Sequence, residues 1–388
     1  MLLAGARLFL EDGIAEGRDV LLRNGRIEAI LPRHETVEAE RMDLPADALL
    51  APGFIDVQVN GGGGVQFNDT PTAEAALAIA AAHRRFGVTS ILPTLITDDP
   101  ALMPRAAEAV EAAHAVPCGG VLGVHFEGPF ISPVRPGVHA AAHIRPLGTV
   151  DLALLTALPA RLPGGRVVVT LAPEMVEDSA LAALAGAGVI LSGGHSAASY
   201  ERTIAAIGHG LRGFTHLFNA MPPATAREPG IIAAALLDPR SWCGVIADGI
   251  HVHPAMLRLA MTCKPDRVLL VSDAMAPTGS AQDSFTLNGR TILRRDGRLV
   301  TAEGVLAGAD TDMASEVRNC VHLLGLPLES ALRMASAVPA SFLGLDDHLG
   351  RIAPGLRADL VLLSPELEVL GSWANGVWQR ADGTDRLL

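Results

Sequence analysis

The chain has 388 residues, of which 49% are hydrophobic and 19% charged, so it has the composition of a globular protein with a large core and not of a disordered one. Its formal net charge of -12 argues against a nucleic-acid or anionic-membrane surface, so an anionic ligand must be met by a local cluster of donors. The four cysteines form no regular framework, and we find no secretory signal or membrane-span pattern, which together favour a cytoplasmic protein with reduced thiols.

The first 51 residues alternate short apolar runs with turn residues. Asn24-Gly25 lies between two such runs and predicts a tight β-hairpin. The tail at 346–388 is β-like again, and its Asn375-Gly376 pair predicts another hairpin. Because an isolated hairpin needs partner strands, we expect residues 1–51 and 346–388 to form one discontinuous β domain.

Between these segments, at 52–345, apolar runs alternate with alanine-rich stretches of helical spacing. Regular alternation of strand and helix predicts an α/β fold with a parallel sheet, and the number of units favours closure into a (β/α)8 barrel. A β insertion is expected at about 284–305, where Asn288-Gly289 and Asp296-Gly297 mark turns. The predicted barrel strands begin with FIDVQVN, TSILPTL, VLGVHFEG and VVVTLAPE, continue with residues 189–191 and 213–215, and end with GVIADG and RVLLVSD.

The segment at 189–221 holds two histidines, each just after a run with the pattern of a buried strand. His195 follows residues 189–191, and His216 follows residues 213–215. Taken alone, each is better explained as a hydrogen-bonded histidine of the interior. Because the carboxyl ends of barrel strands meet at one rim, partners at other strand ends decide between these alternatives.

Such partners exist at the ends of the other predicted strands. A glutamate and two histidines from different strands are a usual ligand set for catalytic zinc, with a position left for water. Glu127, His195 and His216 are therefore the predicted metal ligands, and Asp273 is the predicted general base. For either carboxylate alone, a capping or ion-paired role is the alternative. The remaining polar residues at strand ends are Gln58, Asn60, Asp248 and His251.

Several motifs give the chain a family resemblance that runs almost from end to end. It resembles the N-acetylglucosamine-6-phosphate deacetylases of the amidohydrolase superfamily. The resemblance implies a TIM-type barrel with a small β-sandwich built from both termini. The motifs are PGFIDVQVNGGGGVQFNDT, LPTLITD, GVHFEGPFI, TLAPEM, SGGHS, THLFNAMPP, REPG, IADGIHV, KPDRVLLVSDAMAPTG and APGLRADLVLL.

The resemblance also implies roles for individual residues. Glu127, His195 and His216 match the metal ligands, and Asp273 matches the base that activates water. His139 matches a histidine that faces the substrate and helps to hold or polarise the acetyl carbonyl. The implied contacts to the sugar phosphate come from the remaining positions, which are Asn219, the backbone of Ala220, Arg227 and His251.

The expected cofactor is one divalent ion per subunit, with Zn2+ favoured and Fe2+ or another divalent ion as alternatives. Many amidohydrolases carry H-x-H where this chain has Gln58-Val59-Asn60. Amide side chains are poor zinc ligands beside imidazole, so we expect the second metal of the binuclear members to be missing.

The expected reaction is hydrolysis of N-acetyl-D-glucosamine 6-phosphate to D-glucosamine 6-phosphate and acetate. The resemblance further implies a homodimer in which Arg227 reaches the site of the neighbouring subunit. Three alternatives stay open: a deacetylase for the galactosamine epimer, an amidohydrolase acting on a cyclic amide or purine, and a sugar-phosphate sensor without catalytic activity.

Overall fold

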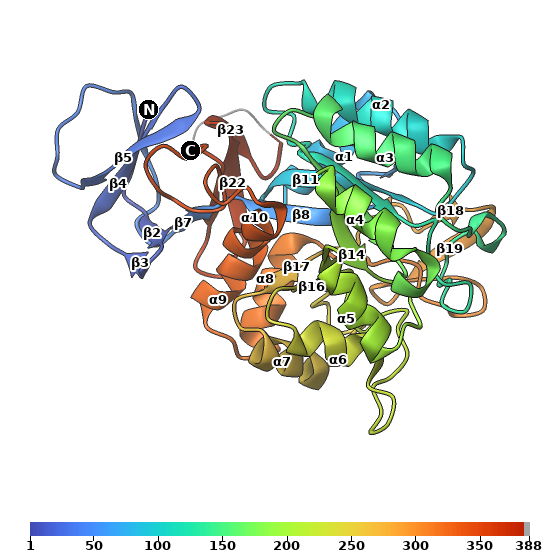
Figure 1. Ribbon diagram of the computed structural model, residues 1–388. Helices are drawn as coiled ribbons and strands as arrows, with labels where there is room; N and C mark the ends of the chain where they lie inside the picture. The colour runs from blue at the N-terminus through green and yellow to red at the C-terminus, as the bar shows by residue number, and fades with distance from the viewer. Residues whose placement is uncertain (384–388) are drawn as a thin grey trace.

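The computed structural model describes residues 1–383, so residues 384–388 of the predicted 346–388 segment lie outside the described residues. Eight parallel strands form a barrel enclosed by helices, which confirms the predicted fold class (Figure 1). Each predicted barrel strand is present. In order around the sheet they are β8 (Phe54–Val59), β11 (Val88–Ile96), β12 (Gly123–Glu127), β13 (Arg166–Leu171), β14 (Ile190–Gly193), β15 (Leu211–Phe214), β16 (Trp242–Val245) and β17 (Val268–Leu270).

The barrel strands are buried on both faces, as expected for parallel strands covered by helices. All residues of β8 and β11 are buried. The barrel closes where Val59, at the end of β8, pairs with Ala274 beyond β17. The backbone N–H of Asp273 donates to the carbonyl of Gln58 at 3.0 Å, so closure places these two residues side by side.

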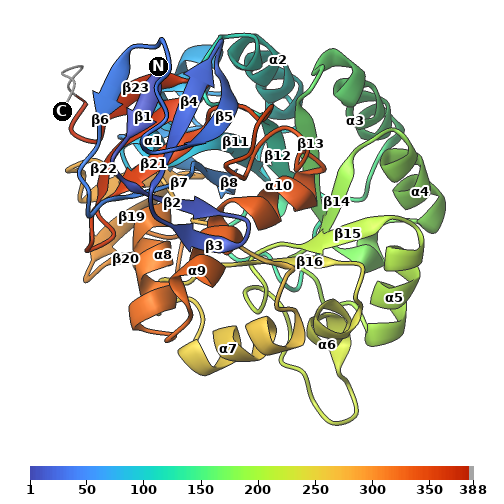
Figure 2. The same cartoon turned by 90° about the vertical axis from the view of Figure 1, so that its left-hand side faces the viewer.

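The helices pack outside the barrel, and α1 shows why they form (Figure 2). Thr72 caps its first turn by accepting from the N–H of Ala75, and Ile79 lies on its buried face. The helices are α1 (Ala73–Arg84), α2 (Leu102–His114), α3 (Thr149–Arg161), α4 (Asp178–Gly186), α5 (Tyr200–Gly208), α6 (Gly230–Leu237), α7 (Pro254–Cys263), α8 (Met313–His322), α9 (Leu328–Ala335) and α10 (Ala337–Leu343), with short 3-10 turns η1 (Ala141–His143) and η2 (Pro173–Met175).

Two further sheets lie beside the barrel, and one of them combines segments from both termini. In that sheet β7 (Leu49–Pro52) pairs in parallel with β2 (Arg7–Leu10) and antiparallel with β21 (Leu360–Leu363), which joins the first and last parts of the chain. The first sheet contains β5 (Arg26–Pro32), β4 (Arg18–Arg23), β1 (Leu2–Ala4) and β6 (Arg41–Asp43). The second contains β23 (Val377–Arg380), β22 (Val369–Ala374), β21 (Leu360–Leu363), β7 (Leu49–Pro52), β2 (Arg7–Leu10) and β3 (Gly13–Ala15).

The four predicted Asn-Gly and Asp-Gly turns all form two-residue hairpin loops. Their Asn and Asp residues have φ between 49° and 51°, and each following glycine is also left-handed. This is the conformation that a hairpin of type I′ requires. Two of these turns shape a three-stranded insertion of β18 (Ser284–Leu287), β19 (Arg290–Arg295) and β20 (Arg298–Val300), and a shorter hairpin joins β9 (Gly61–Gly62) to β10 (Val65–Gln66).

The insertion packs against the carboxyl end of the barrel. Leu287, Ile292 and Leu299 of the insertion share a small hydrophobic cluster with Ile96 and Met275 of the barrel. The four cysteines are free thiols, and no helix within residues 1–383 has the length and apolar character needed to cross a membrane.

Candidate active site

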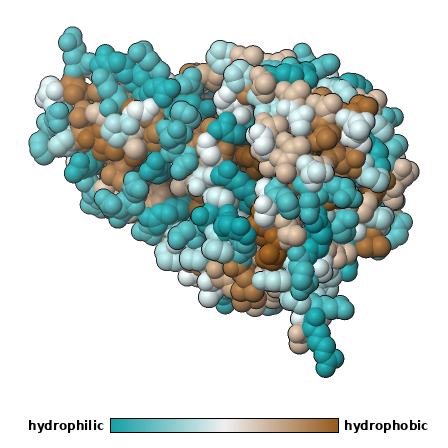
Figure 3. All heavy atoms as spheres, in the orientation of Figure 1, coloured by the Kyte–Doolittle hydropathy of each residue, from teal (hydrophilic) through white to brown (hydrophobic). Residues whose placement is uncertain are grey.

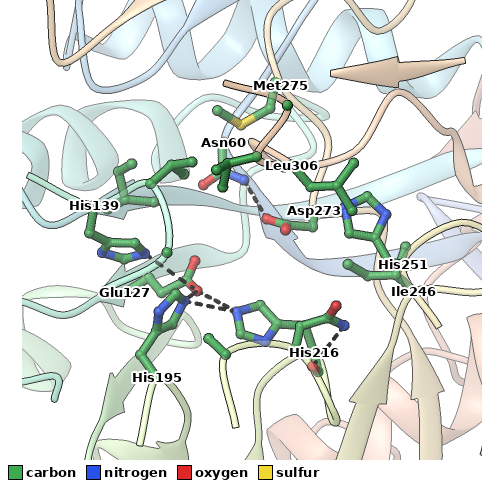
Figure 4. A pocket seen from close by; sticks show the side chains of 18 residues that line it. Asn60, Glu127, His139, His195, His216, Ile246, His251, Asp273, Met275 and Leu306 are labelled. Carbon is green, nitrogen blue, oxygen red and sulfur yellow. Dashed lines mark hydrogen bonds and ion pairs between the residues drawn. The ribbon is translucent and has the colours of Figure 1, made fainter. Parts of the chain in front are cut away.

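A cavity of about 390 Å³ opens at the carboxyl ends of the barrel strands (Figure 4). Glu127 is the last residue of β12, and His195, His216 and Asp273 lie two or three residues beyond their strands. The polar side chains that line the cavity are Asn60, Glu127, His139, His195, His216, Asn219, His251 and Asp273. The structure thus brings the residues predicted from separate parts of the sequence into one place, with Arg227 as the exception.

Three of these residues adopt left-handed backbone conformations. The φ angles are 47° for His195, 31° for His216 and 49° for Asp273. In residues other than glycine, such angles cost about 1–3 kcal/mol each and persist where the surrounding structure imposes them. The strained residues coincide with the strand ends whose side chains point into the cavity, so the strain lies where the chemistry is expected.

The predicted metal ligands form a compact triangle. Glu127 Oε1 is 2.8 Å from His216 Nε2 and 3.1 Å from His195 Nε2, and the two Nε2 atoms are 3.1 Å apart. A tetrahedral ion with bonds of about 2.0–2.1 Å separates its ligand atoms by about 3.3–3.4 Å. The triangle is therefore close to the size that Zn2+ requires, and its N/N/O donor set suits the same ion.

His195 is oriented for ligation by the other side of its ring. Its Nδ1 lies 2.9 Å from the carbonyl oxygen of Arg135, so Nδ1–H donates and the Nε2 lone pair faces Glu127. Burial acts to raise the pKa of Glu127, but the hydrogen bonds and charges of His195 and His216 hold that pKa well below its usual value. Glu127 is therefore a carboxylate that attracts a cation.

His139 is the competitor of His216 for the third ligand position. Its Nε2 is 3.9 Å from Glu127 Oε1, and Glu127, His139 and His195 also form a group that could hold a metal ion. We favour His216 because its Nε2 is closer to Glu127. In addition, Nδ1 of His139 accepts the backbone N–H of Thr97 at 3.3 Å, so in the neutral ring the proton is on Nε2, where it prevents ligation.

The same geometry equips His139 as a hydrogen-bond donor. Burial, followed by the nearby His195, lowers the pKa of His139 well below its usual value, so the ring is neutral. Thr97 Oγ1 also lies 2.8 Å from Nδ1 and fixes the ring plane. The Nε2–H group therefore points toward the metal triangle, where it can donate to a carbonyl oxygen that gains negative charge.

Asp273 has the environment of a general base. Burial, followed by the charge of Glu127, raises its pKa to about 6. Its Oδ1 accepts hydrogen bonds from Gln58 Nε2 at 3.1 Å and from Asn60 Nδ2 at 2.6 Å. These bonds hold one carboxylate oxygen, so the other is available for proton transfer.

Gln58 and Asn60 occupy the positions where many amidohydrolases have their H-x-H pair. Gln58 Nε2 also donates to Glu127 Oε2 at 3.2 Å, so its amide bridges the two carboxylates of the site. Asn60 Oδ1 is buried without a partner among the described residues and lines the cavity. Gln58 is therefore engaged in the site.

The opposite side of the cavity contains the residues expected to hold the sugar phosphate. His251 Nδ1 is 2.6 Å from Asp248 Oδ2, and its buried Nε2 has no partner within residues 1–383. An imidazole held in this way presents Nε2 to a ligand. Asn219 and Ala220 line the cavity beside it, and Ala220 is left-handed with φ of 52°.

Arg227 does not line this cavity. It lies in the exposed segment 223–228 between β15 and α6, which projects from the body of the molecule (Figures 1 and 3). The resemblance to the deacetylases predicts that Arg227 contacts the substrate phosphate in the site of a neighbouring subunit. Arg227 does not reach the cavity of its own chain.

The insertion and several apolar residues complete the cavity, and these contributions were missed in the sequence. Val305 and Leu306, which follow β20, line the cavity together with Ile96 and Met275. The turn pairs revealed the insertion, but no pattern in the sequence indicates that it folds back over the barrel mouth. Thr97 was missed for the same reason, since its role depends on a contact with the distant His139.

Comparison with known proteins places this site in a family. The model of the amidohydrolase family matches residues 49–378. An N-acetylgalactosamine-6-phosphate deacetylase of Shewanella sp. is 40% identical over 97% of this chain and 95% of its own length. The human N-acetylglucosamine-6-phosphate deacetylase is 37% identical over 97% of both chains.

Solved structures of similar proteins superpose on nearly the whole chain. The N-acetylglucosamine-6-phosphate deacetylase of Pasteurella multocida superposes with a TM-score of 0.93 at 33% identity, covering 98% of this chain and 99% of its own. A mutant of the Mycobacterium smegmatis enzyme in complex with N-acetyl-D-glucosamine-6-phosphate superposes with a TM-score of 0.89 at 33% identity, covering 97% of this chain and 98% of its own. The chain therefore belongs to the amidohydrolase family, in the branch of the N-acetylated amino-sugar 6-phosphate deacetylases.

Proposed function

We propose that the protein hydrolyses the acetamide of N-acetyl-D-glucosamine 6-phosphate to D-glucosamine 6-phosphate and acetate, a step of amino-sugar metabolism. The observation that carries this proposal is the buried triangle of Glu127, His195 and His216 with Asp273 in the same cavity. Family members of similar length with this activity support the choice of substrate.

The protein requires a divalent metal ion, which Glu127, His195 and His216 would hold. When bound, such an ion polarises the acetyl carbonyl and lowers the pKa of water. Asp273 accepts the proton of the attacking water and returns it to the departing amine. Because the pKa of Asp273 is raised to about 6, it is a carboxylate near neutral pH yet basic enough to take a proton.

His139 and the residues across the cavity orient the substrate. His139 Nε2–H donates to the carbonyl oxygen as negative charge develops there. Asn219, the backbone of Ala220 and His251 bind the sugar and its phosphate. This assignment rests on their position in the lining of the same cavity.

The bound metal is one ion per chain and is Zn2+. The size of the ligand triangle and its two imidazole ligands support zinc over Mg2+ or Ca2+, which prefer oxygen ligands. Gln58 and Asn60 offer amides where a second ion would need imidazoles. Elemental analysis of the purified protein tests both statements, and two tightly bound ions per chain would contradict the second.

The functional unit is a cytoplasmic homodimer in which Arg227 completes the partner's site. The exposed position of Arg227 outside its own cavity supports this arrangement, because a guanidinium is well suited to bidentate contact with phosphate. We also propose the residue limits 1–51 and 346–388 for the β-sandwich domain, 52–345 for the barrel and about 284–305 for its insertion.

The galactosamine epimer is a second candidate substrate. Two relatives, from Shewanella sp. at 40% identity and Escherichia coli O157:H7 at 36%, are N-acetylgalactosamine-6-phosphate deacetylases. The decisive experiment measures acetate release from both epimeric 6-phosphates and from unphosphorylated N-acetylglucosamine. A larger kcat/KM for the gluco epimer supports the first proposal, whereas equal turnover of the unphosphorylated sugar contradicts the assigned phosphate contacts.

A further inference from the structure

Below the metal triangle, five buried side chains form one continuous series of hydrogen bonds across the barrel interior. His125 Nδ1 lies 3.1 Å from Thr94 Oγ1, and His125 Nε2 lies 2.7 Å from Thr170 Oγ1. Thr215 Oγ1 lies 2.6 Å from both Thr170 Oγ1 and Ser192 Oγ. None of the five residues is more than 6% exposed, so water does not substitute for these bonds.

These five residues, which we call the threonine-histidine chain, come from the four neighbouring strands β11 to β14 and, for Thr215, from the position directly after β15. The metal ligands follow the same strands: Glu127 ends β12, and His195 and His216 lie two residues beyond β14 and β15. His125 precedes Glu127 by two residues on the same face of β12, Ser192 precedes His195 by three, and Thr215 directly precedes His216. The chain therefore ties the three ligand-bearing strands together immediately beneath the site.

The hydroxyl protons give the chain a single direction. Thr94 Oγ1 accepts the N–H of Val59 and lies within hydrogen-bond distance of both Leu92 O and His125 Nδ1; when its single proton goes to Leu92 O, His125 Nδ1–H donates to Thr94. His125 Nε2 then accepts from Thr170, which leaves Thr170 to accept from Thr215 and Thr215 to accept from Ser192. Every member depends on its neighbour, and the loss of one hydroxyl unpairs buried groups on both sides.

We propose that the threonine-histidine chain sets the separation of the strands β12, β14 and β15 and so holds the metal ligands at the spacing of their triangle. Thr170 is its central positioning residue, since β13 contributes no ligand yet links His125 to Thr215. This inference rests on the proposed metal site. It adds that metal affinity depends on residues that touch neither metal nor substrate.

The test compares Thr170→Val, which replaces the hydroxyl by a methyl group of similar size, with Thr170→Ser, which keeps the hydroxyl. Affinity for Zn2+ is measured on metal-free protein by competition with a chromogenic chelator. Thr170→Val should weaken zinc binding by about 10- to 100-fold, the usual effect of losing a partner behind a ligand, while Thr170→Ser stays within about threefold of the parent.

Thr89→Val is the matched control. Thr89 is also a buried barrel threonine, but its hydroxyl donates to Phe54 O at the opposite end of β11. The Thr89→Val variant should leave zinc affinity unchanged, whatever its effect on the melting temperature. The proposal is overturned if Thr170→Val binds zinc as the parent does, if Thr170→Ser loses as much, or if Thr89→Val weakens binding equally.

Should Thr170→Val not fold, Ser192→Ala removes only the first donor of the chain. A rise of about three- to tenfold in the zinc dissociation constant then supports the proposal, and parental affinity refutes it. Zinc binding is measured without substrate, so failure of the proposed function would be seen separately, as a zinc-loaded parent that releases no acetate.

Discussion

Replacing Asp273 by asparagine tests the assignment of the general base most directly. The amide oxygen of Asp273→Asn can still accept from Gln58 Nε2 and Asn60 Nδ2, so the shape of the site and its metal ligands are retained. What is lost is the ability to accept a proton. General base catalysis contributes about 10²–10⁴-fold. The barrier should therefore rise by about 2.7–5.4 kcal/mol.

The dependence of kcat/KM on pH gives a second signature of the same residue. The base works as a carboxylate, so kcat/KM of the parent should fall about tenfold per pH unit below the pKa of Asp273 and level off above it. Burial and the charge of Glu127 place that pKa at about 6 without a metal. A bound cation favours the carboxylate, so the midpoint of the holoenzyme lies at or below about 6.

The assay is acetate release from N-acetyl-D-glucosamine 6-phosphate between pH 4.5 and 8, with the metal content of each preparation determined in parallel. Asp273→Asn should retain its metal, lose turnover, and lose the acidic limb of the profile. Asp19→Asn, a buried carboxylate in the N-terminal sheet, is the control and should behave as the parent. Near-normal turnover by Asp273→Asn would refute the assignment.

Three further predictions concern the partner subunit, the metal and the hairpins. Arg227→Ala should raise KM. A mixed dimer of one Arg227→Ala subunit and one Asp273→Asn subunit has one complete site, so mixing the two variants should restore up to about a quarter of parental activity. No recovery after verified exchange of subunits would place Arg227 outside the partner's site. Removal of the metal by a chelator should abolish acetate release and lower the melting temperature. Adding back Zn2+ at about 100 times its dissociation constant should raise the free energy of unfolding by about 2.7 kcal/mol. Unchanged activity in metal-free protein would exclude the proposed metal site. Gly376→Ala should destabilise the protein more than Gly297→Ala. Both glycines are left-handed, but only at Gly376 would the new Cβ lie 3.1 Å from another backbone atom, Gly25 Cα. Equal melting temperatures of the two variants would contradict this reasoning.

Much of the fold could be predicted because its signals are local. The eight barrel strands are largely apolar runs, and each Asn-Gly or Asp-Gly pair dictates a left-handed turn of two residues. The juxtaposition of Glu127, His195 and His216 followed from one topological rule, that parallel barrel strands end at the same rim. None of these steps required knowledge of a side-chain contact.

The remaining features depend on contacts between distant residues. Thr97 and His139 are separated by 42 positions, and the Nδ1 contacts that fix the proton of His139 on Nε2 follow from the way two loops pack. Likewise, Thr170 and Ser192 are unremarkable in strands of apolar residues until the barrel brings their hydroxyls to Thr215. The projecting segment around Arg227 belongs to the same class, since in the proposed homodimer its role depends on a second subunit.

The charge balance of the site explains why amides suit positions 58 and 60. Glu127 is a buried carboxylate and Asp273 a partly buried one, and the one proposed divalent cation would compensate both charges. A second divalent ion would leave an excess of positive charge in a buried site and would compete for the oxygens that Gln58 and Asn60 now hold. Neutral N–H donors satisfy those oxygens without adding charge. Asp273 therefore keeps its basicity, which a second cation bound to its carboxylate would reduce. In this site the amides preserve the base, which is the physical reason for the proposal of a single metal.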